Sequence, residues 1–333
     1  MKTQISITLL LLMITYSISL HATEKREVSF KNGDINLKGT LYIPKGPGPF
    51  PAVVFVHGSG PETGKNSSYS AKWFASIGYV ALAYDKRGSG ASDGEEKEWS
   101  RFNFNDLAGD VLAAVNFLTT HKKVDKSKIG IHAASQGGWV APLAASKTDL
   151  ISFMIIKSAS VCSVHEDRIF ERSERLKKEG FTETDIMEAS AMQEVEAKTT
   201  KGDNLSDDWT TLFDQNKSKI WFPRVYGGTD PFAKSLIDYR NWYTTIYDFN
   251  SVPYLKQIDI PIFWIFGDPL LDKNGPVKKS IETLKAMRIS GKPYEIHSFV
   301  GESHNVGERK YELSLFNWLF VTNSYNEYKF RKH

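Results

Sequence analysis

The sequence has 333 residues, a formal net charge of +3 and 24% charged residues, a composition typical of an ordinary globular protein. This length allows one large α/β domain with an insertion, or two modest domains. Basic and acidic residues interleave along the chain without an arginine-rich block, which argues against nucleic acid or an anionic membrane as the partner. The single cysteine, Cys162, excludes an intrachain disulfide and a cysteine-based metal site, and we expect it to have a packing role.

The first 22 residues have the pattern of an export signal. Lys2 gives a basic start, residues 5–20 are almost wholly apolar, and Ala22 offers a small residue for cleavage. The apolar run is short for a membrane span, and no stop-transfer pattern follows it. We therefore predict that residues 1–22 are a removed signal peptide, that the protein is exported to the periplasm or secreted, and that no stable membrane insertion remains after cleavage.

The next segments predict an α/β protein with a mainly parallel, doubly wound sheet. The turn sequence Asn32-Gly33-Asp34 predicts a hairpin between strands at 28–30 and 35–42. Continuous apolar runs then alternate with segments of helical spacing, as in parallel strands buried on both faces and the helices that cover them. The predicted strands are 52–56, 79–84, 128–133, 151–157, 260–266 and 294–299, and the predicted helices are 71–77, 102–120, 137–145 and 277–287.

One interval interrupts this alternation. Residues 161–250 contain no strand-like run; they are charged and helix-prone at first and rich in aromatic residues later. We predict a mostly helical cap at 161–250, inserted into an α/β core formed by residues 23–160 and 251–333. The aromatic residues either line a pocket or pack the cap, and packing is the simpler expectation.

Ser135 lies where a predicted strand runs directly into a predicted helix, in the segment GIHAASQGGW at 130–139. A serine at the tip of such a turn points its hydroxyl clear of the sheet, and the helix N-terminus favours negative charge nearby. The usual pattern is Gly-x-Ser-x-Gly; Ala133 replaces the first glycine, and Gly137 retains the second. We interpret Ser135 as a nucleophile, the alternative being a junction that merely contains a serine.

A second turn, His57-Gly58-Ser59-Gly60-Pro61, follows the predicted strand at 52–56. A sharp turn here would aim backbone N–H groups at Ser135. We expect the N–H groups of Ser59 and Gln136 to form an oxyanion hole for a tetrahedral intermediate. His57 is interpreted as a structural residue of the turn and not as a general base.

Activation of a serine hydroxyl requires an imidazole to take its proton and a carboxylate to orient that imidazole. On a sheet of this kind the chain order is serine, acid, histidine. His304 lies in a polar loop after the last predicted strand, where the base is expected. Asp272 and Asp268 both follow the strand at 260–266; Asp272 is favoured because it lies further out in the loop, where a carboxylate can reach His304.

These motifs resemble those of secreted bacterial α/β-hydrolases of the esterase, dienelactone-hydrolase-like and serine-peptidase-like branches. The resemblance covers nearly all of the chain after the signal and includes both turns, the helical insertion and the segment YDKRGSGAS at 84–92, which is similar to the family's Asp-x-Arg-Gly-x-Gly-x-Ser loop. The chain departs from the family at Ala133 and in the lengthened loop at 268–272.

The resemblance implies the α/β-hydrolase fold and hydrolysis of a carboxylic ester through an acyl-enzyme on Ser135, without a metal or organic cofactor. It also implies that Asp85 and Arg87 hold their loop beside the site, a structural role. The expected partner is a small-molecule ester or a short peptide, and the sequence favours no oligomeric state.

Two other functions stay open. A serine aminopeptidase acting on short peptides would use the same residues, but it needs a carboxylate to hold the substrate's N-terminus, which Glu166 or Asp167 would supply. A binding protein that has kept the fold and lost catalysis is the other alternative, and an intact serine and histidine in the right order argue against it.

Overall fold

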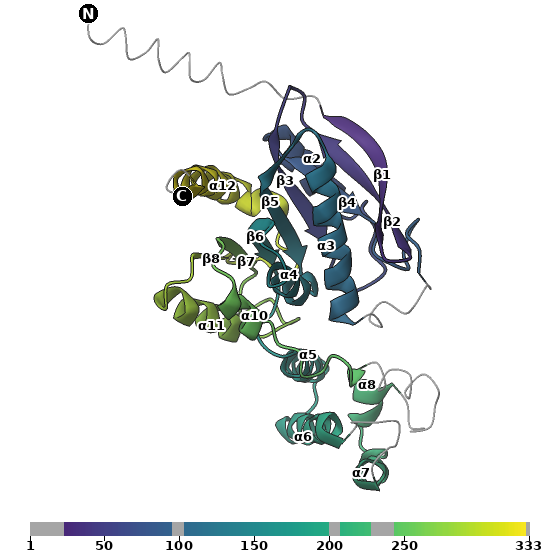
Figure 1. Ribbon diagram of the computed structural model, residues 1–333. Helices are drawn as coiled ribbons and strands as arrows, with labels where there is room; N and C mark the ends of the chain where they lie inside the picture. Colours follow the sequence, from purple (N-terminus) through teal and green to yellow (C-terminus); the bar gives the residue numbers. More distant parts are fainter. Residues whose placement is uncertain (1–22, 95–102, 200–206, 228–242, 331–333) are drawn as a thin grey trace, which may run out of the picture.

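The computed structural model describes residues 23–94, 103–199, 207–227 and 243–330 (Figure 1). The predicted signal peptide at 1–22 therefore lies outside the described residues. Across the described ranges, no helix is long and apolar enough to cross a membrane. The centre of the molecule is an eight-stranded sheet with the strand order β1-β2-β4-β3-β5-β6-β7-β8.

The sheet begins with an antiparallel hairpin and continues in parallel. The hairpin consists of β1 (Glu24–Asn32) and β2 (Ile35–Ile43); β2 also pairs antiparallel with β4, and all later neighbours pair in parallel. The other strands are β3 (Phe50–Val56), β4 (Val80–Tyr84), β5 (Val124–Ala134), β6 (Ile151–Lys157), β7 (Ile262–Phe266) and β8 (Tyr294–Ser298).

The central strands are apolar on both faces because helices cover both faces. Every residue of β4 and of β7 is buried, which explains why continuous apolar runs predicted these strands without an alternating pattern. The predicted mainly parallel, doubly wound sheet is confirmed, and its strand order is that of the α/β-hydrolase fold.

The helices form a layer on each face of the sheet (Figure 1). One face packs against α3 (Phe104–Thr120), α4 (Gly137–Ala145), α10 (Val252–Gln257) and α11 (Val277–Ile289). The other face packs against α2 (Ser68–Ser76) and α12 (Glu308–Phe330). Helix α12 was not predicted from the sequence, although Tyr311, Leu315 and Leu319, which are buried and spaced by four, lie on its inner side.

The interval between β6 and β7 contains helices α5 (Val164–Lys178), α6 (Glu183–Thr199), α7 (Asp207–Asn216) and α8 (Phe222–Tyr226). Figure 1 shows α5–α8 gathered to one side of the sheet. They share a hydrophobic core of their own, in which Phe213, Trp221 and Phe222 are fully buried against Leu176 and Met192. These aromatic residues therefore pack the helices together, as the sequence led us to expect.

Candidate active site

Ser135 lies on a sharp turn between the end of β5 at Ala134 and the start of α4 at Gly137. Its φ of 49° is in the left-handed region, which residues other than glycine adopt at a cost of about 1–3 kcal/mol. The Ser135 N–H donates to the carbonyl of Lys157 at 2.8 Å, and the Ser135 carbonyl accepts from the Gly138 N–H at 2.8 Å. The turn is thus held in its strained conformation from both sides.

The small residues around Ser135 are required by close packing. A Cβ on Gly138 would lie 2.1 Å from the Cβ of Ala159, and one on Gly137 would lie 2.9 Å from the carbonyl oxygen of His57. The same Cβ on Gly137 would lie 3.2 Å from the methyl of Ala133. Ala133 can therefore replace the first glycine of the usual pattern because Gly137 leaves room for it.

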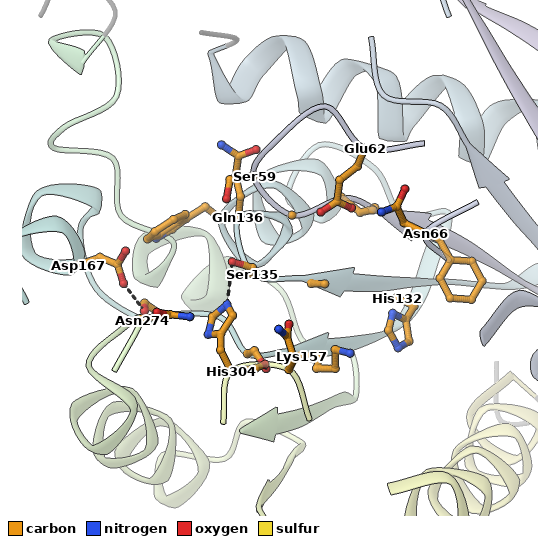
Figure 2. A pocket seen from close by; sticks show the side chains of 18 of the residues that line it. Ser59, Glu62, Asn66, His132, Ser135, Gln136, Lys157, Asp167, Asn274 and His304 are labelled. Atoms are coloured by element: carbon orange, nitrogen blue, oxygen red, sulfur yellow. Dashed lines mark hydrogen bonds between the residues drawn. The ribbon is translucent and has the colours of Figure 1, made fainter. Parts of the chain in front are cut away.

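The structure brings together Ser135, His304 and Asp272, which the sequence places on three separate loops. Figure 2 shows the contact between Ser135 and His304. His304 Nε2 lies 3.2 Å from Ser135 Oγ, and His304 Nδ1 lies 3.2 and 3.3 Å from the two carboxylate oxygens of Asp272. Asp272 is only 2% exposed. With Nδ1 donating to Asp272, Nε2 is left as the acceptor for the serine hydroxyl.

Asp268, the alternative acid, has a different set of contacts. Its carboxylate accepts hydrogen bonds from the N–H of Leu270 at 2.9 Å and the N–H of Gly301 at 3.1 Å. These two bonds lower the pKa of the Asp268 carboxyl. Asp268 therefore ties the loop after β7 to the loop after β8, whereas Asp272 contacts His304.

The turn after β3 lies beside Ser135. His57 is buried, and its Nε2 donates to the carbonyl of Tyr84 at 2.6 Å. Burial, with a smaller effect of Lys86, lowers the pKa of His57 to about 3, so the ring is neutral at pH 7. Ser59 and Gln136, the two expected oxyanion donors, line the same cleft as Ser135.

Lys86 also belongs to this site, although it was not predicted from the sequence. It is 3% exposed, and its ammonium donates to the carbonyls of Gly58 at 2.8 Å and Gly60 at 3.3 Å and to Gln136 Oε1 at 2.8 Å. These partners lie on either side of Ser59 and in the Ser135 turn, so one side chain links the two segments. Burial lowers the pKa of Lys86 to about 8.

Asp85 and Arg87, the neighbours of Lys86, make contacts within the scaffold. Asp85 accepts from the N–H of Gly64 at 2.8 Å and the N–H of Ala91 at 2.9 Å. Arg87 forms a two-pronged pair with the buried carboxylate of Asp110, with both distances 2.7 Å. Both residues thus hold the loop at 84–92 in place.

Ser135 lies between two arms of a cleft of about 520 Å³. In Figure 2, Asp167 and Asn274 lie on one side of Ser135, and Glu62, Asn66 and His132 lie on the other. We call the second side the polar arm, formed by Glu62, Asn66, Ser70, His132, Lys157 and Glu308, and the first side the cap arm, which includes Val164 and Asp167 of α5.

Only one of the two candidate carboxylates for a peptide N-terminus lies in this cleft. Asp167 lines the cap arm and accepts a hydrogen bond from Ser160. Burial raises the pKa of its carboxyl to about 6. Glu166 instead forms an ion pair with Lys279 on α11.

Cys162 is buried, and burial raises the pKa of its thiol, which disfavours the nucleophilic thiolate.

The described ranges contain no group of three histidine, cysteine, aspartate or glutamate residues that could hold a metal ion. At Ser135 the structure places a serine, a histidine and an aspartate in continuous contact on an α/β-hydrolase fold. A hydroxyl, an imidazole and a carboxylate in contact are the groups that acyl transfer through a serine requires.

Comparison with known proteins agrees with this fold. The family model described as serine aminopeptidase, S33, matches residues 47–208, which is 162 of the 333 residues. The esterase EstD of Thermotoga maritima is 34% identical over 154 residues, covering 42% of this chain and 36% of EstD. Human acyl-coenzyme A thioesterase 1 is 29% identical over 138 residues, covering 38% of this chain and 28% of the thioesterase. The matched part thus spans about a third of these relatives' length.

Solved structures extend the similarity to most of the chain. A Pyrococcus furiosus esterase superposes with a TM-score of 0.58 and 16% identity, covering 90% of both chains. The acylaminoacyl peptidase of Pyrococcus horikoshii superposes with a TM-score of 0.52 and 20% identity, covering 90% of this chain and 39% of the peptidase. These findings establish the α/β-hydrolase fold and support a place for the chain in the α/β-hydrolase superfamily.

Proposed function

We propose that the protein is a serine hydrolase that cleaves carboxylic esters of small substrates. The observation that carries the proposal is the continuous contact from Ser135 Oγ through the His304 ring to the buried Asp272 carboxylate. The sequence similarity to EstD supports an ester as the substrate. An inactive binding protein has no need to retain a strained serine at the end of this chain of contacts.

In the mechanism, His304 Nε2 takes the proton of Ser135 as Oγ attacks the ester carbonyl. The N–H groups of Ser59 and Gln136 would stabilise the oxyanion that forms. His304 then protonates the leaving alcohol, and in a second cycle it activates water to release the acid and free Ser135. Asp272 keeps the imidazole in the tautomer that accepts at Nε2 and stabilises the imidazolium.

The test is covalent labelling followed by a substrate panel. A fluorophosphonate is expected to add once to the native protein, with the added mass on the peptide that contains Ser135, and heat-denatured protein is the control. Nitrophenyl esters from acetate upward are expected to be hydrolysed, with rates that fall beyond short acyl chains. An unlabelled native protein would favour the inactive binding protein.

A serine aminopeptidase acting on short peptides is the second candidate, and Asp167 is the observation that favours it. Its buried carboxylate faces the cleft and is mostly ionised at pH 7, given a pKa of about 6. It would therefore be available to a substrate ammonium group. Aminoacyl nitroanilides in the same panel separate the two functions, because a preference for the anilides over the esters would make the protein a peptidase.

The contacts of Lys86 lead to a prediction about both rate and pH. The Lys86→Met variant loses the donor to three acceptors around the oxyanion segments, so we expect kcat to fall about 100-fold. Because Lys86 is charged below its pKa of about 8 and neutral above it, kcat of the wild type should decline as the pH rises through 8.

The conservative variant separates this effect from a general structural role. Arginine stays protonated throughout this range, so the Lys86→Arg variant should lose the alkaline decline in kcat even if its rate at pH 7 is reduced. Rates are measured from pH 6.5 to 9.5 with thermal melting as a check on folding. The same alkaline decline in the arginine variant would contradict the assignment to Lys86.

A further inference from the structure

The polar arm of the cleft presents hydrogen-bonding side chains to a bound substrate. They come from separate parts of the fold: Glu62 and Asn66 from the loop after β3, Ser70 from α2, Lys157 from the end of β6, and Glu308 from the start of α12. Figure 2 shows Glu62, Asn66 and Lys157 on the same side of Ser135 as His132. The remaining lining of the cleft is mixed: it includes the apolar side chains of Phe104, Val164 and Ile246 and the charged Asp167, Arg168 and Glu171 of α5.

His132 gives this arm an unused hydrogen-bonding group. It is on β5, three residues before Ser135, and is only 5% exposed. Its Nε2 atom is buried and has no hydrogen-bond partner among the described residues. Burial, with a smaller effect of Lys157, lowers the pKa of His132 to about 3, so the imidazole is neutral and Nε2 either donates or accepts according to its tautomer.

A second unpartnered group lies close by. The hydroxyl of Tyr311 is buried without a partner among the described residues. His132 and Tyr311 line a small cavity of about 10 Å³, together with Ser70 and Glu308. Such a volume holds about one water molecule. Ser70, His132 and Glu308 line both this cavity and the main cleft. Because a buried polar group without a partner is unfavourable, this part of the arm favours a water or a ligand that can form hydrogen bonds.

The charges of the arm are close to balanced. Lys157 Nζ donates to the carbonyl of Val306 at 3.3 Å and lies 3.8 Å from the Glu308 carboxylate. Burial raises the pKa of the Glu62 carboxyl, and the charge of the nearby Lys86, which does not line the cleft, lowers it by a smaller amount. Each carboxylate of the arm thus has an ammonium group near it, and the arm does not present a cluster of charges of one sign to a ligand.

We propose that the polar arm binds a neutral, hydroxyl-bearing part of the substrate, so that the preferred ester is hydroxylated on one side of the scissile bond. This rests on the proposed hydrolase function. A hydroxyl both donates and accepts, so it pairs with carboxylate, ammonium, amide and imidazole groups alike. An alkyl group of the same size would remove water from these groups without replacing their hydrogen bonds.

The test compares matched esters that differ only in hydroxyl groups. One pair varies the alcohol, propyl acetate against 2,3-dihydroxypropyl acetate, and the other varies the acyl group, ethyl butanoate against ethyl 3-hydroxybutanoate. For at least one pair we expect kcat/KM of the hydroxylated ester to exceed that of the alkyl ester by about ten-fold or more. Equal values in both pairs would overturn the proposal.

Variants of the arm provide the second measurement. The His132→Phe variant removes the unpartnered nitrogen and keeps a ring of similar size, so the preference for the hydroxylated ester should fall several-fold. His121, at the C-terminal end of α3, is the matched control, and the His121→Phe variant should keep the full preference. If His132→Phe misfolds in thermal melting, Ser70→Val is measured instead.

Labelling of Ser135 by the fluorophosphonate separates failure of this proposal from failure of the proposed function. A protein that labels and hydrolyses both esters of each pair equally remains a serine hydrolase, and only the assignment of the arm is overturned. A preference that His132→Phe and Ser70→Val both leave intact also overturns it. A protein that neither labels nor hydrolyses any ester overturns both proposals.

Discussion

The Ser135→Ala variant is expected to hydrolyse esters about a million-fold more slowly than the wild-type protein. Without Oγ no acyl-enzyme forms, and His304 has no hydroxyl from which to take a proton. The remaining rate would come from substrate binding and the oxyanion donors alone. The measurement is kcat with a nitrophenyl ester under single-turnover conditions, which detects very slow hydrolysis.

This loss should not result from unfolding. Alanine at position 135 adopts the same positive φ of 49° as the serine, so the variant introduces no new backbone strain. The backbone hydrogen bonds of the turn, to Lys157 and from Gly138, are unaffected. The melting temperature should therefore stay within a few degrees of the wild type.

Ser146→Ala is the matched control for this variant. Ser146 caps the C-terminal end of α4, the helix that begins just after Ser135, and its hydroxyl donates to the carbonyl of Leu143. The control should retain full activity. A Ser135→Ala protein with more than about one per cent of the wild-type kcat would mean that another group is the nucleophile.

The sheet could be predicted from the sequence because burial on both faces leaves a continuous apolar run. The predicted range 151–157 agrees with β6, and 137–145 agrees with α4. Within 161–250 only a mostly helical character was predicted, without the ends of single helices; the start of α5 at Val164 is set by the cap hydrogen bond from the Glu166 N–H to Ser163 Oγ. Such a cap is a local feature that hydrophobic spacing does not reveal.

The residues of the site that closely follow a strand could be predicted from the sequence. Ser135 and His304 each follow a strand closely, so chain order and loop position were sufficient to identify them. Lys86 and His132 were not predictable in the same way. Their surroundings are assembled from segments far apart in the chain, so the burial of Lys86 among three acceptors and the burial of His132 Nε2 without a partner among the described residues are properties of the packed molecule.

The choice between Asp272 and Asp268 as the acid also required the three-dimensional structure of the loop that contains them. Both aspartates follow β7, and the sequence offers only their distance from the strand as a guide. The chain turns between the two residues, and the Asp272 N–H donates to the carbonyl of Asp268 at 2.8 Å. As a result the two carboxylates have different partners. Asp272 contacts His304, and Asp268 accepts from the N–H groups of Leu270 and Gly301.

The Asp272→Asn variant should lower kcat by about ten-thousand-fold, with little change in KM. An asparagine amide can donate a hydrogen bond to His304 Nδ1. This favours the tautomer in which Nε2 carries the proton, and a protonated Nε2 cannot accept the proton of Ser135. The size and shape of the side chain are preserved, so the effect should be on chemistry and not on packing. The measurement is the pair of values kcat and KM with one nitrophenyl ester.

The Asp268→Asn variant is the matched control, because it makes the same chemical change four residues away. It replaces one of the two carboxylate oxygens that accept from loop N–H groups by a donor amide and alters no contact of His304, so kcat should stay within a few-fold of the wild type while the melting temperature falls. If the two variants exchanged these behaviours, Asp268 would be the acid in solution, and the loop after β7 would have to rearrange when substrate binds. If neither variant lowered kcat by more than about ten-fold, His304 would act without a carboxylate partner, and the contact between His304 and Asp272 would have only a structural role.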